Sequence, residues 1–548
     1  MRKGLLFLSI ICLLSGVTFG QTVVTGNLLD QDGKPMQVAD VELLIPGNAI
    51  PLDTVRASSD GNYTISIDSS GIWFLRFAGV SHESHEVAVC TDKPGKIGID
   101  VRLAAYQYFD TISTPGLEGD FNKYNIADPM PMEKQPDGTF TADIKTMADS
   151  IQYEIVGIAK NDHTVNGTEA DHFVIDNAGD YWSVMKPVNG VVHVLFDPAR
   201  LVISDRPEAV VFADSESTAA RFSKAYDEML KNQSDFIAAM VAFRNSGKDF
   251  SHFKYDWTTE SAKLQRQVSA ETNDMVRQAL LLDYVDIASM GADVNYKLIE
   301  QAIQDDSESS LIWSLSPDLY VRMLEIYRVT GRDLDQHIDR FIAENPSAFA
   351  KSSVLFERFI YAKYMNDEQR AEKYYKILTE EYAGTPLGKT AKENYSPIAT
   401  VKIGRPVPEF SISSLSDSSK IWSNDSFKGK YYMIDFWATW CGPCVGEMQY
   451  LQDAYSEFKD RNFTMLSISL DSSPEDVVKF REGKWPMPWH QAFAPGGWNN
   501  KVVSAFGVIA IPNPILVDPS GKVVAMGNEL RGAELKVTLA RFLDKKKE

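Results

Sequence analysis

Two cysteines spaced three residues apart are the residues with the clearest chemical potential in this sequence. Cys441 and Cys444 enclose the dipeptide Gly442-Pro443, an apolar strand-like run precedes them, and a helical pattern follows. A sulfur at the N-terminus of a helix is stabilised as a thiolate by the unpaired backbone N–H groups and by the helix dipole. Because the thiolate is the nucleophile of thiol–disulfide exchange, the motif predicts a redox-active dithiol.

The two sulfurs are expected to act one after the other. Cys441, at the exposed start of the helix, is predicted to be the attacking thiolate, with a pKa below the value of about 8.5 of free cysteine. Cys444, one turn further along, is predicted to be the less exposed resolving thiol. Because a thiol must lose its proton before it attacks, Cys444 needs a base nearby.

Two carboxylates are candidates for that base. Asp435 interrupts the apolar run six residues before Cys441, where an unpaired carboxylate costs several kcal/mol unless it has a use. Glu447 follows Cys444 by three residues and therefore lies on the same side of the predicted helix. A carboxyl group buried beside a thiol has a raised pKa and can relay a proton near neutral pH. For Glu447, an ordinary surface position on the helix is the alternative.

The elements that must position these residues fill the last part of the chain, 399–548. The hydrophobic pattern there predicts two strands with a helix between them, a second helix, a hairpin and a final helix: 431–437, 441–458, 463–470, 474–482, 514–517 with 522–525, and 534–545. Strands that alternate with helices in this way predict an α/β domain.

The remaining chain is long enough for several further domains, since the whole sequence has 548 residues. Residues 21–104 and 105–212 alternate polar and apolar positions between turn signals, which predicts two β-sandwich domains. Residues 213–398 change to a helical period and predict helix pairs of tetratricopeptide (TPR)-like type. The predicted fold class is therefore multidomain α+β, with two N-terminal β-sandwiches, a helical middle and a C-terminal α/β domain.

The N-terminus predicts export. A positively charged start and an apolar run over 5–14 precede small residues, so residues 1–20 are predicted to be a signal peptide cleaved ahead of Gln21. Lipid anchoring at Cys12 is the less favoured alternative, because bulky Ile11 stands where a small residue is usual. We therefore expect a periplasmic or otherwise exported protein.

The composition argues against several other function classes. The formal net charge is −20 and no basic stripe is found, which argues against DNA and other nucleic acids as partners. The remaining cysteine, Cys90, is interpreted as a small buried strand residue. A zinc site at the CxxC motif would need two more Cys or His ligands, and His490 is the nearby candidate. We expect no metal and no cofactor.

The last quarter of the chain resembles the thioredoxin fold and, within it, the TlpA/ResA group of exported thiol–disulfide oxidoreductases. The resemblance rests on four features beside the CxxC motif: Phe436-Trp437-Ala438 before it, Trp440 next to it, Ile511-Pro512 downstream, and Asp518-Pro519-Ser520-Gly521 as the hairpin turn. It implies a thioredoxin-like enzyme whose substrates are protein thiols and disulfides. The stretches 21–104 and 105–212 resemble a carboxypeptidase-regulatory-like module and an early-set immunoglobulin-like domain.

The resemblance also implies roles for residues around the cysteines. Asp435 matches the buried Asp of thioredoxins, and Glu447 matches a Glu of the ResA group. Pro512 is the expected cis-proline. Ile511 would then offer its backbone N–H and C=O to a bound peptide, and the other residues implied in substrate binding flank the first sulfur: Trp440, Gly442 and Pro443.

The resemblance also bears on the direction of electron flow. Gly442-Pro443 is the thioredoxin-like dipeptide and indicates a reducing couple, nearer to about −270 mV than to about −120 mV; oxidase and isomerase remain open. A reductase in an oxidising compartment needs an electron donor, for which the family implies a membrane protein of the DsbD or CcdA type. Asn513-Pro514 departs from the family pattern and leaves the substrate range open. A peroxiredoxin is not indicated, because Ile434 and Ala438 stand where Pro and Thr are expected.

A binding protein is the alternative from a different class. Some early-set domains bind glycogen or starch, and Tyr124, Tyr181 and Trp182 are available for stacking on a sugar, although packing is their favoured role. The helix pairs in 213–398 could hold a peptide partner. In this alternative the chain is a glycan- or peptide-binding scaffold with a secondary redox domain.

Overall fold

The structure, a computed structural model, describes most of the chain. The described residues are 20–112, 114–125, 128–161, 163–176, 179–246, 252–329, 331–365, 367–395, 401–483 and 485–544. The predicted signal peptide, with Cys12, lies outside them apart from Gly20. Within the described ranges, no helix combines the length and the apolar character needed to cross a bilayer. The chain divides into two compact units, Met1–Ala350 and Lys351–Glu548.

The first unit begins with two four-stranded sheets that enclose one core. Their strand orders are β16-β7-β1-β4 and β3-β2-β5-β6. The strands are β1 (Thr22–Leu29), β2 (Ala39–Leu44), β3 (Asp53–Arg56), β4 (Asn62–Ile67), β5 (Gly71–Gly79), β6 (His85–Thr91), β7 (Lys96–Arg102) and β16 (Ala209–Phe212). Val24, Leu75 and Val101 are among the completely buried side chains between the sheets, as expected when the inner faces of two sheets interdigitate.

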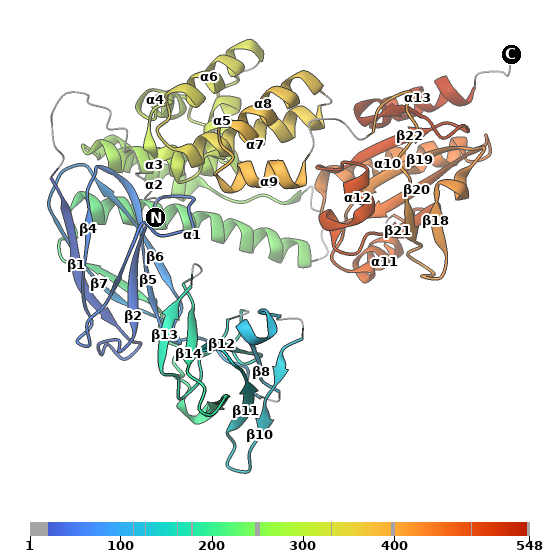
Figure 1. The fold of residues 1–548 in the computed structure, drawn as a ribbon. Helices are drawn as coiled ribbons and strands as arrows, with labels where there is room; N and C mark the ends of the chain where they lie inside the picture. Colours follow the sequence, from blue (N-terminus) through green and yellow to red (C-terminus); the bar gives the residue numbers. More distant parts are fainter. Residues whose placement is uncertain are drawn as a thin grey trace, which may run out of the picture. The chain divides into compact units, whose positions relative to one another are not determined.

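A second pair of sheets follows, coloured cyan to green in Figure 1. The strand orders are β10-β11-β15 and β13-β14-β12-β8-β9. The strands are β8 (Gly116–Gly119), β9 (Met130–Pro131), β10 (Glu133–Lys134), β11 (Phe140–Lys145), β12 (Ile151–Val156), β13 (His172–Ile175), β14 (Tyr181–Met185) and β15 (Val191–Phe196). Their core contains Phe140, Tyr153 and Phe196. The β-rich N-terminal region predicted from the sequence is confirmed, whereas the assignment to two named domain families stays a prediction.

Strand β16 does not join this second pair of sheets, although the predicted second domain extends to residue 212. It pairs antiparallel with β7, so that Ala209 lies opposite Arg102 and Phe212 opposite Ile99. Val210 and Phe212 pack against the core of the first two sheets. This burial of apolar side chains explains why the chain returns to the first sheet before the helices begin.

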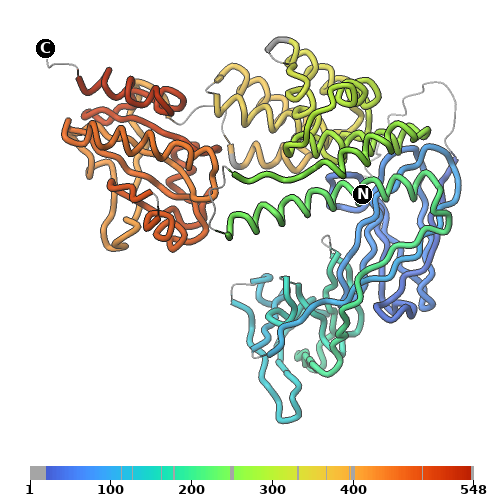
Figure 2. The backbone as a smooth tube through the Cα atoms, turned by 180° about the vertical axis from the view of Figure 1, so that it is seen from behind, coloured from blue at the N-terminus to red at the C-terminus, as the bar shows by residue number. Residues whose placement is uncertain are grey.

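The middle of the chain is helical, as predicted. The helices are α1 (Thr218–Asn245), α2 (Thr258–Ala270), α3 (Asp274–Ser289), α4 (Tyr296–Asp305), α5 (Asp318–Ile326), α6 (Gly331–Glu344), α7 (Ala348–Tyr364), α8 (Glu368–Glu380) and α9 (Pro386–Asn394). The long α1, drawn in green in Figure 2, packs on β6 and α3. The second unit begins within α7, at Lys351. The predicted boundary at 398/399 falls among residues outside the described ranges.

The last domain contains a five-stranded mixed sheet of order β21-β20-β19-β22-β23. A small hairpin, β17 (Ser411–Ser413) with β18 (Ile421–Ser423), precedes it. The further elements are β19 (Tyr431–Trp437), α10 (Gly442–Phe458), β20 (Phe463–Ser469), α11 (Pro474–Glu482), β21 (His490–Phe493), α12 (Lys501–Ala505), β22 (Asn513–Val517), β23 (Val523–Met526), the short 3₁₀ helix η7 (Gly527–Leu530) and α13 (Glu534–Leu543). The predicted thioredoxin-like α/β domain is therefore confirmed.

The central strand β19 has two buried faces. It pairs parallel with β20 and antiparallel with β22, which explains its nearly continuous apolar sequence. Ile434 and Phe436 point into a core that includes Val503 of α12. Met433 and Trp437 point into the opposite core, which α10, α11 and α13 cover. Because side chains alternate along a strand, Asp435 points to this second face, beneath α10.

Candidate active site

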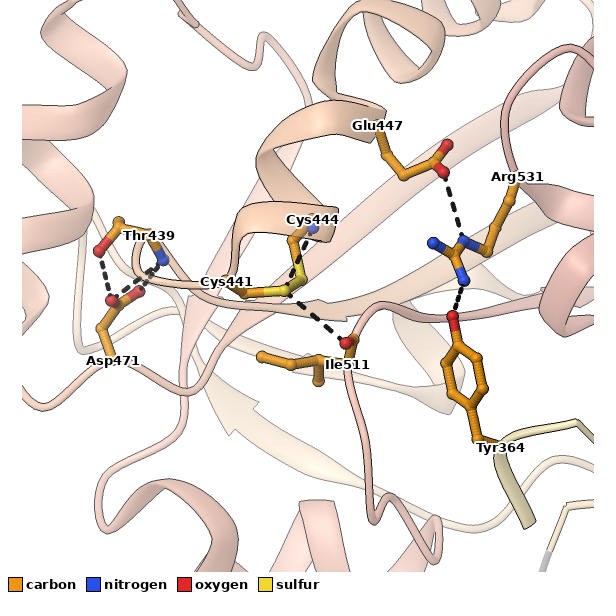
Figure 3. The surroundings of a disulfide bond; sticks show 8 residues. All are labelled: Tyr364, Thr439, Cys441, Cys444, Glu447, Asp471, Ile511 and Arg531. Atoms are coloured by element: carbon orange, nitrogen blue, oxygen red, sulfur yellow. Dashed lines mark hydrogen bonds and ion pairs between the residues drawn. A yellow bond between two sulfur atoms is a disulfide. The ribbon is translucent and has the colours of Figure 1, made fainter. Parts of the chain in front are cut away.

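The two cysteines lie where β19 is followed by α10. Cys441 is the N-cap residue of α10, and its Sγ accepts a hydrogen bond from the backbone N–H of Cys444 at 3.1 Å. The two sulfurs are joined in a disulfide, so the structure represents the oxidised form (Figure 3). Pro443 lies in the first turn of α10, where a backbone N–H would have no acceptor within the helix, so that the lack of an N–H in proline costs no hydrogen bond. The sequence therefore places one sulfur at a helix N-terminus, as expected.

The peptide segment before β22 approaches the first sulfur. The carbonyl oxygen of Ile511 lies 3.7 Å from the Sγ of Cys441, and Figure 3 shows both residues. The Ile511–Pro512 peptide bond is cis, which confirms that expectation. The two predicted substrate-binding features, the Ile511 backbone and the residues flanking Cys441, therefore meet at the disulfide.

Exposure of the first sulfur differs from the sequence-based expectation. Cys441 is only 5% exposed, although Cys444 is still more buried at 1%. Trp440, by contrast, is 46% exposed, and Gly442 and Pro443 are exposed as well. Cys441 is covered because it is bonded to Cys444 and belongs to the core against which Ile511 packs.

A buried carboxylate holds the loop that leads into Cys441. Asp471, just after β20, accepts hydrogen bonds from the backbone N–H of Thr439 at 3.1 Å and from its hydroxyl at 2.6 Å. The hydroxyl of Ser469 donates to the same carboxylate at 2.6 Å. The bonds to Thr439 fix the chain two residues before Cys441 (Figure 3). The sequence showed Asp471 only as the start of a turn.

Asp435 is buried as predicted, at 3% exposure. Burial is the largest cause that raises the pKa of its carboxyl group, the nearby Glu447 carboxylate raises it further, and the Arg531 guanidinium opposes both; the result is a pKa of about 7. At neutral pH this group is therefore divided between its acid and base forms, as a proton relay requires.

Glu447 is engaged in a defined set of contacts and is not a free surface residue. Its Oε2 accepts a hydrogen bond from the backbone N–H of Gly532 at 2.7 Å. Its Oε1 accepts from Nε of Arg531 at 3.3 Å, and both side chains of this ion pair are largely buried. Arg531 also donates from Nη1 to the hydroxyl of Tyr364 on α7 (Figure 3). Sequence reasoning missed Arg531 and Tyr364, because they lie 84 and 83 residues from Glu447 and no motif marks them.

The other candidate residues belong to the first compact unit. Tyr181 is buried and donates to Asp40 and to the carbonyl oxygen of Ala78, and Trp182 packs edge-on against Tyr124 with ring centroids 4.9 Å apart. Cys90 is buried on β6. In the part of the chain that the structure describes, no group of three or more His, Cys, Asp or Glu side chains could hold a metal ion.

Comparisons with known proteins match the same domain. The model of the AhpC/TSA family matches residues 403–526. The thiol-disulfide oxidoreductase ResA of Bacillus cereus is 31% identical over 160 residues, which cover 29% of this chain and 87% of the relative. ResA of Bacillus thuringiensis subsp. konkukian is 31% identical over 145 residues, or 26% of this chain and 79% of the relative.

Solved structures include a thioredoxin domain of a thiol-disulfide oxidoreductase from Bacteroides vulgatus. It is 34% identical, covers 26% of this chain and 99% of its own, and has a TM-score of 0.24. The segment that the AhpC/TSA family model matches, 403–526, holds the disulfide, the cis-proline and the buried Asp435. Through this C-terminal domain, the chain belongs to the ResA-type family of thioredoxin-like thiol-disulfide oxidoreductases.

Proposed function

We propose that the protein is an exported reductase of protein disulfides that works through Cys441 and Cys444. The observation that carries the proposal is the cap of α10, where the Sγ of Cys441 accepts the N–H of Cys444 at 3.1 Å and is bonded to the second sulfur. A backbone donor and a helix N-terminus favour the thiolate once the disulfide is reduced.

The exchange proceeds in two substitutions at sulfur. The Cys441 thiolate of the reduced enzyme attacks one sulfur of a substrate disulfide, forms a mixed disulfide and releases the other substrate sulfur as a thiolate. Cys444 then loses its proton and attacks the Sγ of Cys441. This step forms the Cys441–Cys444 disulfide and releases the second substrate thiolate. The substrate gains two electrons and two protons, and the enzyme dithiol is oxidised.

Two residues support the second substitution. Asp435, with a pKa of about 7, is the base that accepts the proton of Cys444. Glu447 is the second carboxylate of the site, three residues after Cys444 on the same side of α10. Trp440, Gly442 and Pro443 form the exposed rim on which a substrate peptide docks, and Ile511 pairs with its backbone.

Return to the reduced state needs a reductant outside the chain. A membrane-bound thiol donor of the DsbD or CcdA type fits this need, since a protein exported through the signal-like N-terminus would work in an oxidising compartment. The signal-like sequence and the Gly442-Pro443 dipeptide are the support for export and for the reducing direction.

Turnover and trapping test the proposal with the mature chain. Cys441→Ser should abolish reduction of insulin disulfides, whereas Cys444→Ser should accumulate mixed disulfides that a thiol reductant releases. The double variant Cys441→Ser/Cys444→Ser controls for binding without exchange. Undiminished reduction by Cys441→Ser would refute the mechanism. Glycan or peptide binding that persists in the double variant, together with negligible turnover in the unaltered protein, would support a scaffold instead.

A further inference from the structure

Arg531 joins three parts of the second unit at one guanidinium group. It follows η7, and its Nε donates to Oε1 of Glu447 on α10 at 3.3 Å. Its Nη1 donates to the hydroxyl of Tyr364 at the end of α7, and its Cζ lies 5.7 Å from the centroid of that ring. Figure 3 shows the three side chains in a row, with Arg531 in the middle. Tyr364 and Arg531 both lie outside the segment that matches the AhpC/TSA family model.

The Glu447 carboxylate has little freedom as a result. One oxygen accepts from the Arg531 side chain, and the other accepts from the N–H of Gly532, the next residue, at 2.7 Å. Charge-assisted bonds to both oxygens hold the carboxylate in one orientation. The orientation of the Glu447 carboxylate therefore depends on Arg531 and on the backbone N–H of Gly532.

The same guanidinium acts on Asp435. Two charged groups interact with this buried carboxyl group, Glu447 from α10 and Arg531 from the segment after η7, and Arg531 is the one that favours its ionised form. Its direct neighbours in the sheet, Ser467 on β20 and Pro514 on β22, carry no charge.

Two cations on the other covering helices have contacts of their own. Lys536 of α13 pairs with Glu457, near the far end of α10, at 3.1 Å. Arg481 of α11 donates to the carbonyl oxygen of Met487. Among the residues that the structure describes, Arg531 is therefore the cation that interacts with both Asp435 and Glu447.

We propose that Arg531 is a positioning residue of the redox site, held by Tyr364, which orients Glu447 and sets the pH range in which Cys444 loses its proton. The proposal rests on the function proposed above, because it assigns Cys444 as the resolving thiol. It makes the last turn of α7, outside the thioredoxin-like domain, a part of the redox site.

The direction of the effect follows from charge. Loss of the guanidinium removes a cation that favours both the Asp435 carboxylate and a thiolate nearby, and it leaves Glu447 without its ion pair. Both changes disfavour the Asp435 carboxylate and the Cys444 thiolate, so Cys444 should lose its proton at a higher pH. A direct opposite charge shifts a titration by about 1 to 3 units, and we expect about 0.5 to 1 unit here because Arg531 acts through the carboxylates.

The surroundings of Arg531 permit a chemical rescue. Arg531 and Tyr364 line a cavity of about 550 Å³, whose wall also includes Lys363, Pro512 and Asn528. This volume is large enough to admit a guanidinium ion in place of a truncated side chain. Free guanidinium, at a concentration that does not unfold the protein, should then bind in this cavity and restore part of the positive charge that is lost with the Arg531 side chain.

The test measures alkylation of Cys444 against pH in the full mature chain carrying Cys441→Ser, with mass spectrometry to read the site. In this background, Arg531→Gln should raise the midpoint pH of Cys444 alkylation by about 0.5 to 1 unit. With Arg531→Lys, the midpoint should stay close to that of the protein with Arg531. Tyr364→Phe should raise the midpoint by less than Arg531→Gln does. Arg461→Gln is the matched control, because Arg461 pairs with Asp544 at the surface and should leave the midpoint unchanged. Guanidinium should lower the raised midpoint of Arg531→Ala.

Two results would overturn the proposal. One is an unchanged midpoint in a folded Arg531→Gln protein, and the other is a shift that neither Arg531→Lys nor guanidinium reverses, which would indicate a packing role. If the Arg531 variants do not fold, Tyr364→Phe removes a single oxygen and decides the question by the same midpoint. Absence of insulin reduction by the unaltered protein would refute the proposed function, yet the titration of Cys444 would still be readable.

Discussion

Cys90 and Cys441 are both buried, at 2% and 5% exposure, but their surroundings differ in kind. Cys90 lies within β6, where burial is the largest cause that raises the pKa of its thiol to about 12, with Asp92 adding to it. Cys441 instead caps α10 and accepts the backbone N–H of Cys444. Burial alone therefore does not decide whether a thiol reacts. The donors directed at the sulfur and a second thiol within reach decide it.

The largest expected difference between the two regions is the rate of alkylation. In the reduced protein at pH 7, Cys441 should react with iodoacetamide at least about 1,000-fold faster than Cys90, since a pKa at or below about 8.5 leaves far more thiolate than one of about 12. Site-resolved mass spectrometry over time measures both rates. In the urea-unfolded chain the rates should converge. Similar alkylation rates of Cys441 and Cys90 in the native protein would contradict the proposed difference between the two thiols.

The second effect concerns the carboxyl group beneath α10. The native pKa of Asp435, about 7, is above the unfolded value of about 3.9. Its protonation therefore contributes stability that is complete below about pH 4 and is lost as the pH rises through about 7. Asp435→Asn does not lose this contribution, so its stability relative to the unaltered protein should rise with pH, by about 3 kcal/mol between pH 5 and pH 8.

Urea unfolding of the oxidised proteins at pH 5 and pH 8 measures that change. Asp460→Asn, at an exposed position, is the control and should not reproduce the change expected for Asp435→Asn. A difference for Asp435→Asn that does not vary with pH would contradict the assigned environment. The same substitution should also slow the resolution of mixed disulfides, because it removes the group that we propose as the base for Cys444.

A third, smaller effect concerns the loop before Cys441, which has no counterpart at Cys90. Asp471→Ala removes the acceptor for the N–H and hydroxyl of Thr439 and for the hydroxyl of Ser469. Buried donors left without partners should cost about 1 to 3 kcal/mol of unfolding free energy. Thermal or urea unfolding measures the loss, and Asp417→Ala, at an exposed turn, is the control. Unchanged stability would show that the loop is held by other contacts.

The smallest effect is expected at Cys90 itself. Cys90→Ala should leave insulin reduction unchanged and cost about 1 kcal/mol, the usual consequence of a modest change in a packed core. Parallel assays of turnover and unfolding decide the matter. A loss of turnover without a loss of stability would assign Cys90 a role in the redox reaction and would end the contrast with Cys441.

The elements that carry the cysteines could be predicted because their signals are local. The apolar run 431–437 and the helix ending at Phe458 have the expected bounds, apart from Cys441, which is the cap and not the first helical residue. Cys444 and Pro512 belong to motifs of two to four residues. Asp435 was recognisable as a lone charge in an apolar strand.

The remainder of the site is built from contacts distant in sequence. Tyr364 and Arg531 are 167 residues apart, and Asp471 binds a residue 32 positions before it. Arg531 is an isolated Arg before a helix, and Asp471 is an Asp at a turn. Many surface residues have the same kind of sequence context. Only packing shows which of them meets the site, and the oxidised state conceals Cys441 more than its place at a helix start implies.

The return of β16 to the first sheet has a consequence for the architecture. Because Ala209 lies opposite Arg102 in an antiparallel pair, the chain leaves the first sandwich and re-enters it at neighbouring positions. Antiparallel partners are only about 5 Å apart. The second pair of sheets is thus an insertion within a hairpin, and a two-residue turn could replace it. Deletion of this module should leave β7 and β16 joined, and the shortened chain should retain its ability to fold and to carry the redox domain.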